Sequence, residues 1–364
     1  MRMHRIGMRE AASVGIIFVI TKIFLPFQRS MLEIGGTAAW LIALIAIMFC
    51  PVTWWCIRGV IKNASEGASL ITATEEILGP VLGSVVNLAY FSFFYAITFI
   101  VLREFAEILK SDILPRTPIQ MIMLSLLIPI AVVAHSGIEN IGRLCWLTIG
   151  LILVSVMVMI IGGLISHTEP NALSPFWGTG RSQVLKMGVV RSSLFSELLV
   201  LGFLVPRLRK RKEWERVVWP CMLISSLILF STILAYLYIF PYPAGLRISF
   251  PLYEISRVIM FGRWVQRVES LFLVVWLTCA VIKLAIGLYC SASTLAQVLR
   301  MPAFHPLIFP LSILAYSLAL LPESLMSAVE WDRDYLRIYG SLFSICLPLM
   351  TWLVSLVRRK RQLL

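Results

Sequence analysis

One apolar segment, residues 187–206, contains side chains that could do chemistry: Arg191, Ser192, Ser193, Ser196 and Glu197. The segment is long enough to cross a bilayer, and at a helical rise of ~1.5 Å per residue Glu197 lies roughly 15 Å from either end. An ionised carboxylate at that depth needs a partner, a water-filled cavity or a proton. We interpret Glu197 as part of a binding site or a pathway. The alternative is a buried ion pair that only fixes helix packing.

The composition is that of a polytopic membrane protein. The 364 residues are 59% hydrophobic and 14% charged, whereas soluble domains carry roughly 25% charged residues. We expect an all-α integral membrane protein that forms a single transmembrane domain over residues 1–364. Its ten transmembrane helices are predicted at residues 10–28, 37–57, 80–102, 118–135, 144–165, 187–206, 217–240, 264–290, 304–322 and 338–357.

The net charge of +13 sets the orientation and does not indicate nucleic-acid binding. The two densest basic clusters are RLRKRKEWER at 207–216 and RRKR at 358–361, and both fall in segments predicted to be cytoplasmic. Positive residues collect on the cytoplasmic side of membrane proteins. We therefore expect both termini to be cytoplasmic, with the basic segments close to anionic membrane lipid.

Residue spacing gives no support for an enzyme. The seven cysteines form no CxxC pair, and the four histidines have no zinc-like spacing. The chain also lacks a phosphate-binding loop, a dinucleotide fingerprint and a nucleophile elbow. We expect no catalytic residues, no cofactor and no metal.

The ten predicted spans divide into five plus five around residues 166–186. An odd number of spans in each half makes the second half enter the membrane from the opposite side, as in an inverted repeat. The repeats are predicted at about 10–165 and 187–357. In such folds the first helix of each half, here helices 1 and 6, is interrupted at the ligand. Polar residues occur in both: Thr21 and Lys22 in helix 1, and the Arg191–Glu197 cluster in helix 6.

Several longer segments carry a resemblance to a known family. They are RTPIQ at 116–120, IENIGRLCWL at 138–147, PFWGTG at 175–180, FPLYEISR at 250–257 and QRVESLFLVVWL at 266–277. In order and spacing the chain resembles the B-subunit (GerAB-type) family of spore germination nutrient receptors. That family is similar to amino-acid permeases of the amino acid–polyamine–organocation (APC) superfamily.

The resemblance implies a LeuT/APC-like fold with a ligand pocket among spans one, three, six and eight. It also implies a nutrient sensor in the inner membrane of a bacterial spore, with a larger A subunit and a lipid-anchored C subunit as partners. One departure concerns span one, where many relatives have a Gly-x-Gly break. Here Thr21, Lys22 and Ile23 occupy that stretch, so glycine does not lower the cost of unwinding the helix there.

We assign the candidate ligand-binding residues to spans one, three and six: Gly15, Thr21, Lys22, Tyr90, Tyr95, Thr98, Ser192, Ser193, Ser196 and Glu197. Gly15 and the tyrosines have packing within the bundle as an alternative role. Glu197 is predicted to face the bundle interior toward span one or eight, and Lys22 to contact it. The alternative for Lys22 is snorkelling to the surface, which is the favoured interpretation for Lys283.

Three functions fit these features. The first is a receptor subunit that binds a small germinant, an amino acid, in a mid-membrane pocket and signals to partner subunits. The second is a proton-coupled amino-acid transporter, or permease, in which Glu197 or Lys22 changes protonation. The third is a membrane scaffold with a vestigial pocket. Receptors and transporters can have the same fold, so the fold alone does not decide which function applies.

The topology gives a direct prediction. In a variant without native cysteines, a single cysteine placed within 207–216 should react with a membrane-impermeant thiol reagent only after the membrane is opened, because this basic cluster is expected inside. A cysteine placed within 166–186 is the matched control and should react from outside. Labelling of the 207–216 site in sealed cells would contradict the topology.

Overall fold

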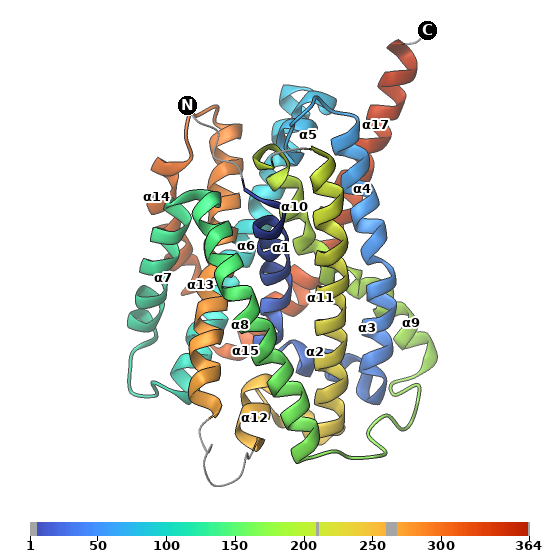
Figure 1. Cartoon of the computed structure of the whole chain (residues 1–364), viewed down its shortest axis with the longest axis vertical. Coiled ribbons are helices and arrows are strands. Elements are labelled where there is room, and N and C mark those ends of the chain that lie inside the picture. Colours follow the sequence, from blue (N-terminus) through green and yellow to red (C-terminus); the bar gives the residue numbers. More distant parts are fainter. Residues whose placement is uncertain (1–5, 209–210, 260–267, 363–364) are drawn as a thin grey trace.

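The computed structural model describes residues 6–208, 211–259 and 268–362, and over these ranges the chain is a bundle of helices. Most long helices run along the long axis of the molecule (Figure 1). The first described helix begins at the same end of the bundle at which the last described helix ends. Strand-like pairing in the described ranges is limited to one isolated bridge, between Ile6 and Leu208. The all-α class predicted from the sequence is therefore confirmed.

Short breaks divide the chain into many helical segments. Gly79, at φ 89°, separates two consecutive helices, and Gly137, at φ 83°, begins another directly after a break, because this backbone conformation suits glycine. The elements are α1 (Met8–Ile20), η1 (Thr21–Phe24), α2 (Phe27–Gly35), η2 (Gly36–Ala38), α3 (Ala39–Met48), α4 (Cys50–Lys62), α5 (Leu70–Leu78), α6 (Pro80–Asp112), α7 (Ile119–His135), α8 (Gly137–Ser166), α9 (Arg181–Val190), η3 (Arg191–Leu198), α10 (Leu199–Leu204), η4 (Val205–Arg207), α11 (Arg211–Ile239), η5 (Ala244–Arg247), α12 (Pro251–Val258), α13 (Val268–Val298), α14 (His305–Ala319), α15 (Leu325–Glu330), η6 (Trp331–Leu336), α16 (Arg337–Ser341), η7 (Leu342–Cys346) and α17 (Leu347–Gln362).

Seven helical stretches of the described chain are long and apolar enough to cross a membrane. They are Phe27–Lys62, Pro80–Asp112, Gly137–Ser166, Arg181–Arg207, Glu213–Ile239, Phe272–Val298 and Leu325–Arg358. Two shorter apolar helices are Ile119–His135 and His305–Ala319. These nine stretches correspond to predicted spans two to ten. The count of ten crossings stays a prediction.

The first predicted span ends earlier than residue 28. Its α-helical part, α1, passes into the 3-10 segment η1, and Leu25 then leaves the helix with an extended backbone at φ −98° and ψ 178°. The cause is Pro26, since the residue before a proline is disfavoured in the α conformation. The chain turns there into α2, so the break lies at the end of the first span.

Several other helices extend beyond the predicted spans, and two of these extensions matter for the site. Helix α6 continues to Asp112 instead of residue 102, and the last helical stretch begins at Leu325 instead of residue 338. Both extensions carry charged residues into the bundle, where the sequence analysis had placed loops. They supply several of the groups described below.

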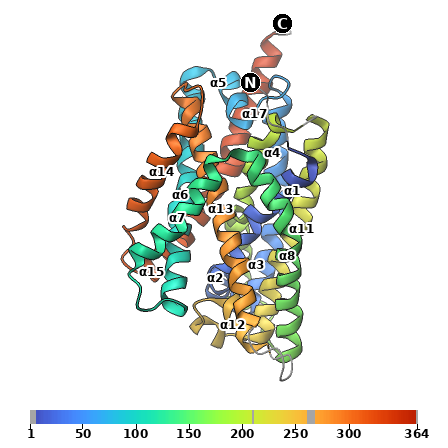
Figure 2. The ribbon, with the colours of Figure 1, turned by 60° about the vertical axis from the view of Figure 1, so that its left-hand side comes forward.

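Helix α1 lies in the middle of the bundle (Figures 1 and 2). Every residue from Val14 to Ile20 is buried, and the helix packs against α8, α11, α13 and η3. Gly15 allows the closest approach. A methyl group added there would lie 2.8 Å from Leu201 Cδ2 and 2.9 Å from Cys221 Sγ. The surroundings of Gly15 are thus those of a helix-packing residue.

Gly15 and Gly150 form a matched pair for testing this packing. We expect Gly15→Ala to lower the free energy of unfolding by about 1–3 kcal/mol, because the added methyl group overpacks α1. Gly150 lies on α8 with nothing within 4 Å of an added methyl group. Gly150→Ala should leave stability unchanged or raise it by up to about 1 kcal/mol. Thermal unfolding in detergent measures both, and a Gly15→Ala protein as stable as wild type would contradict the assignment.

Candidate functional site

Three irregular helical segments meet inside the bundle. They are the 3-10 segments η1 and η3 and the π-helical segment η6. Such segments change the hydrogen-bond pattern of a helix and often occur at functional sites. Here they free main-chain carbonyls for side chains: the carbonyl of Leu194 accepts from Lys22 at 2.5 Å, and that of Arg333 accepts from Arg191 at 3.5 Å.

Glu197 is the centre of a buried charge cluster formed by these segments. Its side chain is 0% exposed, and three cations surround it. Oε1 lies 2.8 Å from Lys283 Nζ and 3.3 Å from Arg337 Nη1, while Oε2 lies 2.8 Å from Lys22 Nζ. The Lys22 contact has the distance of an ion pair but not the angles of a hydrogen bond, so Oε2 has no hydrogen-bond partner among the described residues.

This geometry decides between the alternatives for the two lysines. The predicted contact between Lys22 and Glu197 is confirmed, as is the interior position of Glu197. Snorkelling of Lys283 is wrong: its side chain is 0% exposed and donates to the Phe18 carbonyl at 2.7 Å as well as to Glu197. Phe18 lies in the last turn of α1, where carbonyls lack an intrahelical partner. That carbonyl and the carboxylate together hold the ammonium inside the bundle.

Arg337 joins the centre to a second carboxylate. Its Nε donates to Asp332 Oδ2 at 3.0 Å, and its main-chain carbonyl accepts from the hydroxyl of Ser193. Arg333, beside Asp332 on η6, bonds Asp334 and reaches Glu33 Oε2 of α2 at 3.0 Å. The network therefore runs from Glu197 through η6 to α2.

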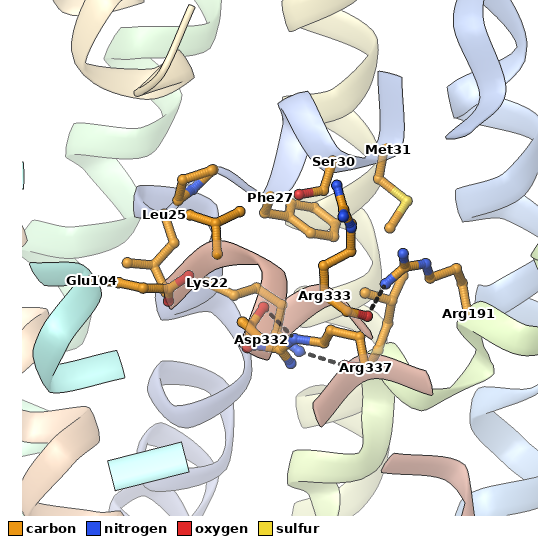
Figure 3. A pocket seen from close by; sticks show the side chains of 13 residues that line it. Lys22, Leu25, Phe27, Ser30, Met31, Glu104, Arg191, Asp332, Arg333 and Arg337 are labelled. Carbon is orange, nitrogen blue, oxygen red and sulfur yellow. Dashed lines mark hydrogen bonds and ion pairs between the residues drawn. The ribbon is translucent and has the colours of Figure 1, made fainter. Parts of the chain in front are cut away.

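A small cavity lies against this network (Figure 3). About 20 Å³ of it is open to water, which is room for about one molecule. Three polar atoms of lining residues are buried without a hydrogen-bond partner in the described structure: Glu104 Oε2, Arg191 Nε and Asp332 Oδ1. The lining residues are Lys22, Leu25, Pro26, Phe27, Ser30, Met31, Glu104, Arg191, Leu194, Val329, Asp332, Arg333 and Arg337.

Of the ten candidate ligand-binding residues, Lys22 lines this cavity. Glu197 and Ser193 contact groups that line it. The hydroxyl of Ser196 lies near Gly340, where an added methyl group would meet it at 3.0 Å, and Ser192 is buried. Their roles in binding stay predictions.

The other candidates lie away from the cavity lining. Thr21 and Thr98 donate to carbonyls one turn earlier in their own helices. Tyr95 donates to the Leu311 carbonyl at 2.8 Å, and its ring stacks on Phe91. The Tyr90 hydroxyl is buried without a partner among the described residues.

Sequence reasoning missed Glu104, Asp332 and Arg337, and it did not count Arg191 among the ligand-binding residues. The three missed residues lie in helix extensions that had been assigned to loops. A signal was present in the last segment, because no proline interrupts residues 325–347. An uninterrupted helix through that stretch carries its charges into the bundle.

The long apolar helices and the buried charge cluster define a polytopic membrane protein, and comparisons with known proteins identify its class. The profile of a family described as spore germination protein matches residues 5–326. The chain therefore belongs to the spore germination protein family, and it is an integral membrane protein. The resemblance found in the sequence segments is confirmed.

Two relatives from Bacillus subtilis (strain 168) align over most of the chain. Spore germination protein KB is 23% identical over 371 residues, covering 100% of this chain and 97% of the relative. Spore germination protein A2 is 24% identical over 340 residues, covering 92% of this chain and 91% of the relative.

A solved structure shows the same fold. It is Mhp1, a nucleobase-cation-symport-1 family transporter, in a closed conformation with bromovinylhydantoin bound. The TM-score is 0.67 at 12% sequence identity, over 90% of this chain and 74% of the other. The fold is thus of a transporter type, and neither the family description nor this neighbour is that of an enzyme.

The buried Lys22–Glu197 pair can be tested with a double-mutant cycle. Glu197→Gln leaves three cations without their carboxylate, so it should destabilise more than Lys22→Met. The double variant should be less destabilised than the sum of the single effects by about 0.5–3 kcal/mol. The surface pair Lys62 and Glu215 is the control and should couple by less than about 1 kcal/mol. Strict additivity in the buried cycle, measured by unfolding in detergent, would show that the contact contributes nothing.

Proposed function

We propose that this protein is the nutrient-sensing subunit of a spore germination receptor and that its ligand is an amino acid. The observation that carries the proposal is the small cavity of Figure 3, in which carboxylate and guanidinium atoms lack hydrogen-bond partners among the described residues. A ligand with a positive and a negative group would satisfy both kinds of atom. Membership of the spore germination protein family supports the sensing role.

The cavity as described is too small for an amino acid, so binding requires movement. Phe27 and Met31 of α2 line one side of the cavity, and Arg333 of η6 joins that helix through Glu33. A ligand that separates α2 from η6 would favour an open arrangement of the bundle. In this proposal, that change is the signal passed to A and C subunits of the receptor.

The proposed architecture is a single transmembrane domain of ten helices in a five-plus-five inverted repeat, in the spore inner membrane with both termini cytoplasmic. Two features support it. Segment η1 follows α1, and η3 follows α9, so a 3-10 segment follows the first α-helix of each proposed repeat. The first described helix also begins at the same end of the bundle at which the last described helix ends (Figure 1). A chain that starts and finishes on one side of a membrane crosses it an even number of times.

Proton-coupled amino-acid transport is the second candidate. The transporter fold shared with Mhp1 favours it, and a buried carboxylate among lysines is a group that a proton cycle would use. Both functions require that the protein binds an amino acid. They differ in whether the ligand leaves on the other side of the membrane.

Binding and uptake measured on the same preparation test this proposal. We expect at least one of the twenty standard L-amino acids to raise the unfolding temperature of the purified protein, since a ligand that binds the folded state stabilises it. Uptake of that amino acid into proteoliposomes, with and without a pH gradient, should not exceed that of protein-free vesicles.

Arg191→Gln should weaken this binding about tenfold by removing a charged donor from the cavity. Arg143→Gln is the matched control, because Arg143 is well exposed and pairs only with Glu139 in the described structure. Uptake driven by the pH gradient would favour transport instead. Absence of binding by all twenty amino acids would contradict both functions.

A further inference from the structure

Glu104 is a buried carboxylate that the Glu197 cluster does not use. It projects from α6 into the cavity and its side chain is 1% exposed. Within the described residues, no cation lies at ion-pair distance from it, and its Oε2 has no hydrogen-bond partner. Because a buried, unpaired carboxylate is costly, Glu104 must either hold a proton or meet a cationic group that is not part of this chain.

Asp332 offers a second acceptor to the same cavity. Its Oδ2 is taken by Arg337 Nε, but its Oδ1 is buried and without a partner among the described residues. Two carboxylates from different segments, α6 and η6, thus present unused oxygen atoms to one small space. An ammonium group carries three donors and suits more than one acceptor.

Arg191 contributes a positively charged group to the same cavity. Its Nε is buried and has no hydrogen-bond partner in the described structure, and its Nη1 makes one long bond of 3.5 Å to the Arg333 carbonyl. In the view of Figure 3, Glu104 and Arg191 come from opposite sides, with Asp332 and Arg333 between them. The cavity therefore has an unused carboxylate oxygen at one side and an unused guanidinium nitrogen at the other, among the described residues.

We propose that Glu104 and Asp332 form the subsite for the α-ammonium group of the amino acid, with Arg191 on its carboxylate. This assignment rests on the proposed function and specifies its ligand as a zwitterion. It excludes carboxylic acids in which a hydroxyl group replaces the amino group, since a hydroxyl brings no positive charge to Glu104 and has one donor for two carboxylates. Such a site rejects an analogue that lacks the required donor.

The test compares amino acids with matched hydroxy acids. The probes are the L-amino acids that bind in the screen above, each beside the L-2-hydroxy acid with the same side chain. Choline replaces sodium and potassium in the buffer, and a second series contains sodium. Wild-type protein should bind the amino acid at least about tenfold more tightly than the hydroxy acid in both series.

Variants of α6 complete the test. Glu104→Gln should weaken amino-acid binding about tenfold and remove the preference over the hydroxy acid. Glu107→Gln is the matched control: it lies one turn further along the same helix, pairs with Arg103 and does not line the cavity. Its affinity and preference should match those of wild type.

The outcomes separate the two proposals. Failure of all amino acids to bind would overturn the proposed function and this inference together. Equal binding of amino and hydroxy acids by wild type would overturn the inference alone, whether or not any variant folds. A Glu104→Gln protein with wild-type affinity would also overturn it, because a neutral amide would then serve as well as the carboxylate. If hydroxy acids bound wild-type protein as tightly as the amino acids when sodium is present, the two carboxylates would be assigned to an inorganic cation. That result would also overturn the inference.

Discussion

Glu197 carries a single negative charge among the side chains of Lys22, Lys283 and Arg337, where none of the four is more than 5% exposed. Charges removed from water are tolerated only when partners and hydrogen bonds compensate them. One carboxylate therefore fixes the relative positions of η1, η3, α13 and α16. The helices around it can be apolar along most of their length because their charged residues meet at this point.

The irregular segments make this cluster possible. A regular α-helix uses nearly all of its carbonyls internally, whereas its ends leave several free. The Phe18 carbonyl at the end of α1 and the Leu194 carbonyl within η3 accept from the two lysines. Each ammonium is thus shared between a carboxylate and a main-chain dipole. The interruption of the helices and the burial of the charges are two consequences of the same local geometry.

The cavity beside the cluster has a different electrostatic character. In the Glu197 cluster every charge has an opposite charge at contact distance. Glu104 and Arg191, by contrast, have polar atoms without a hydrogen-bond partner in the described part of the chain, in a space for about one water molecule. Such a site is small and yet unsatisfied, so a ligand that supplied both charges would have to force the walls apart. A sensor and a transporter both need this property, and the fold shared with a transporter at 12% identity is compatible with either.

The sequence by itself determined the helical class, the membrane setting, the approximate positions of the spans and the need of Glu197 for a cation. These follow from apolar runs and from the cost of a charge in a bilayer, which are local properties. The family followed from longer sequence segments. Lys22 was predicted as the partner because an inverted repeat, which stays a prediction here, would place the first helices of the two halves together.

Only the tertiary structure decided which other residues share the site. Lys283 lies in an apolar segment near a predicted membrane boundary, as a snorkelling lysine does. Its side chain points into the bundle because other helices supply a carboxylate and a carbonyl that bind its ammonium group. Glu104, Asp332 and Arg337 follow or precede the apolar runs, where a sequence pattern cannot separate a loop from a helix that continues. Helix continuation there depends on partners across the bundle. A pattern read along one chain does not contain those contacts, because they form between residues up to 300 positions apart, as for Glu33 and Arg333.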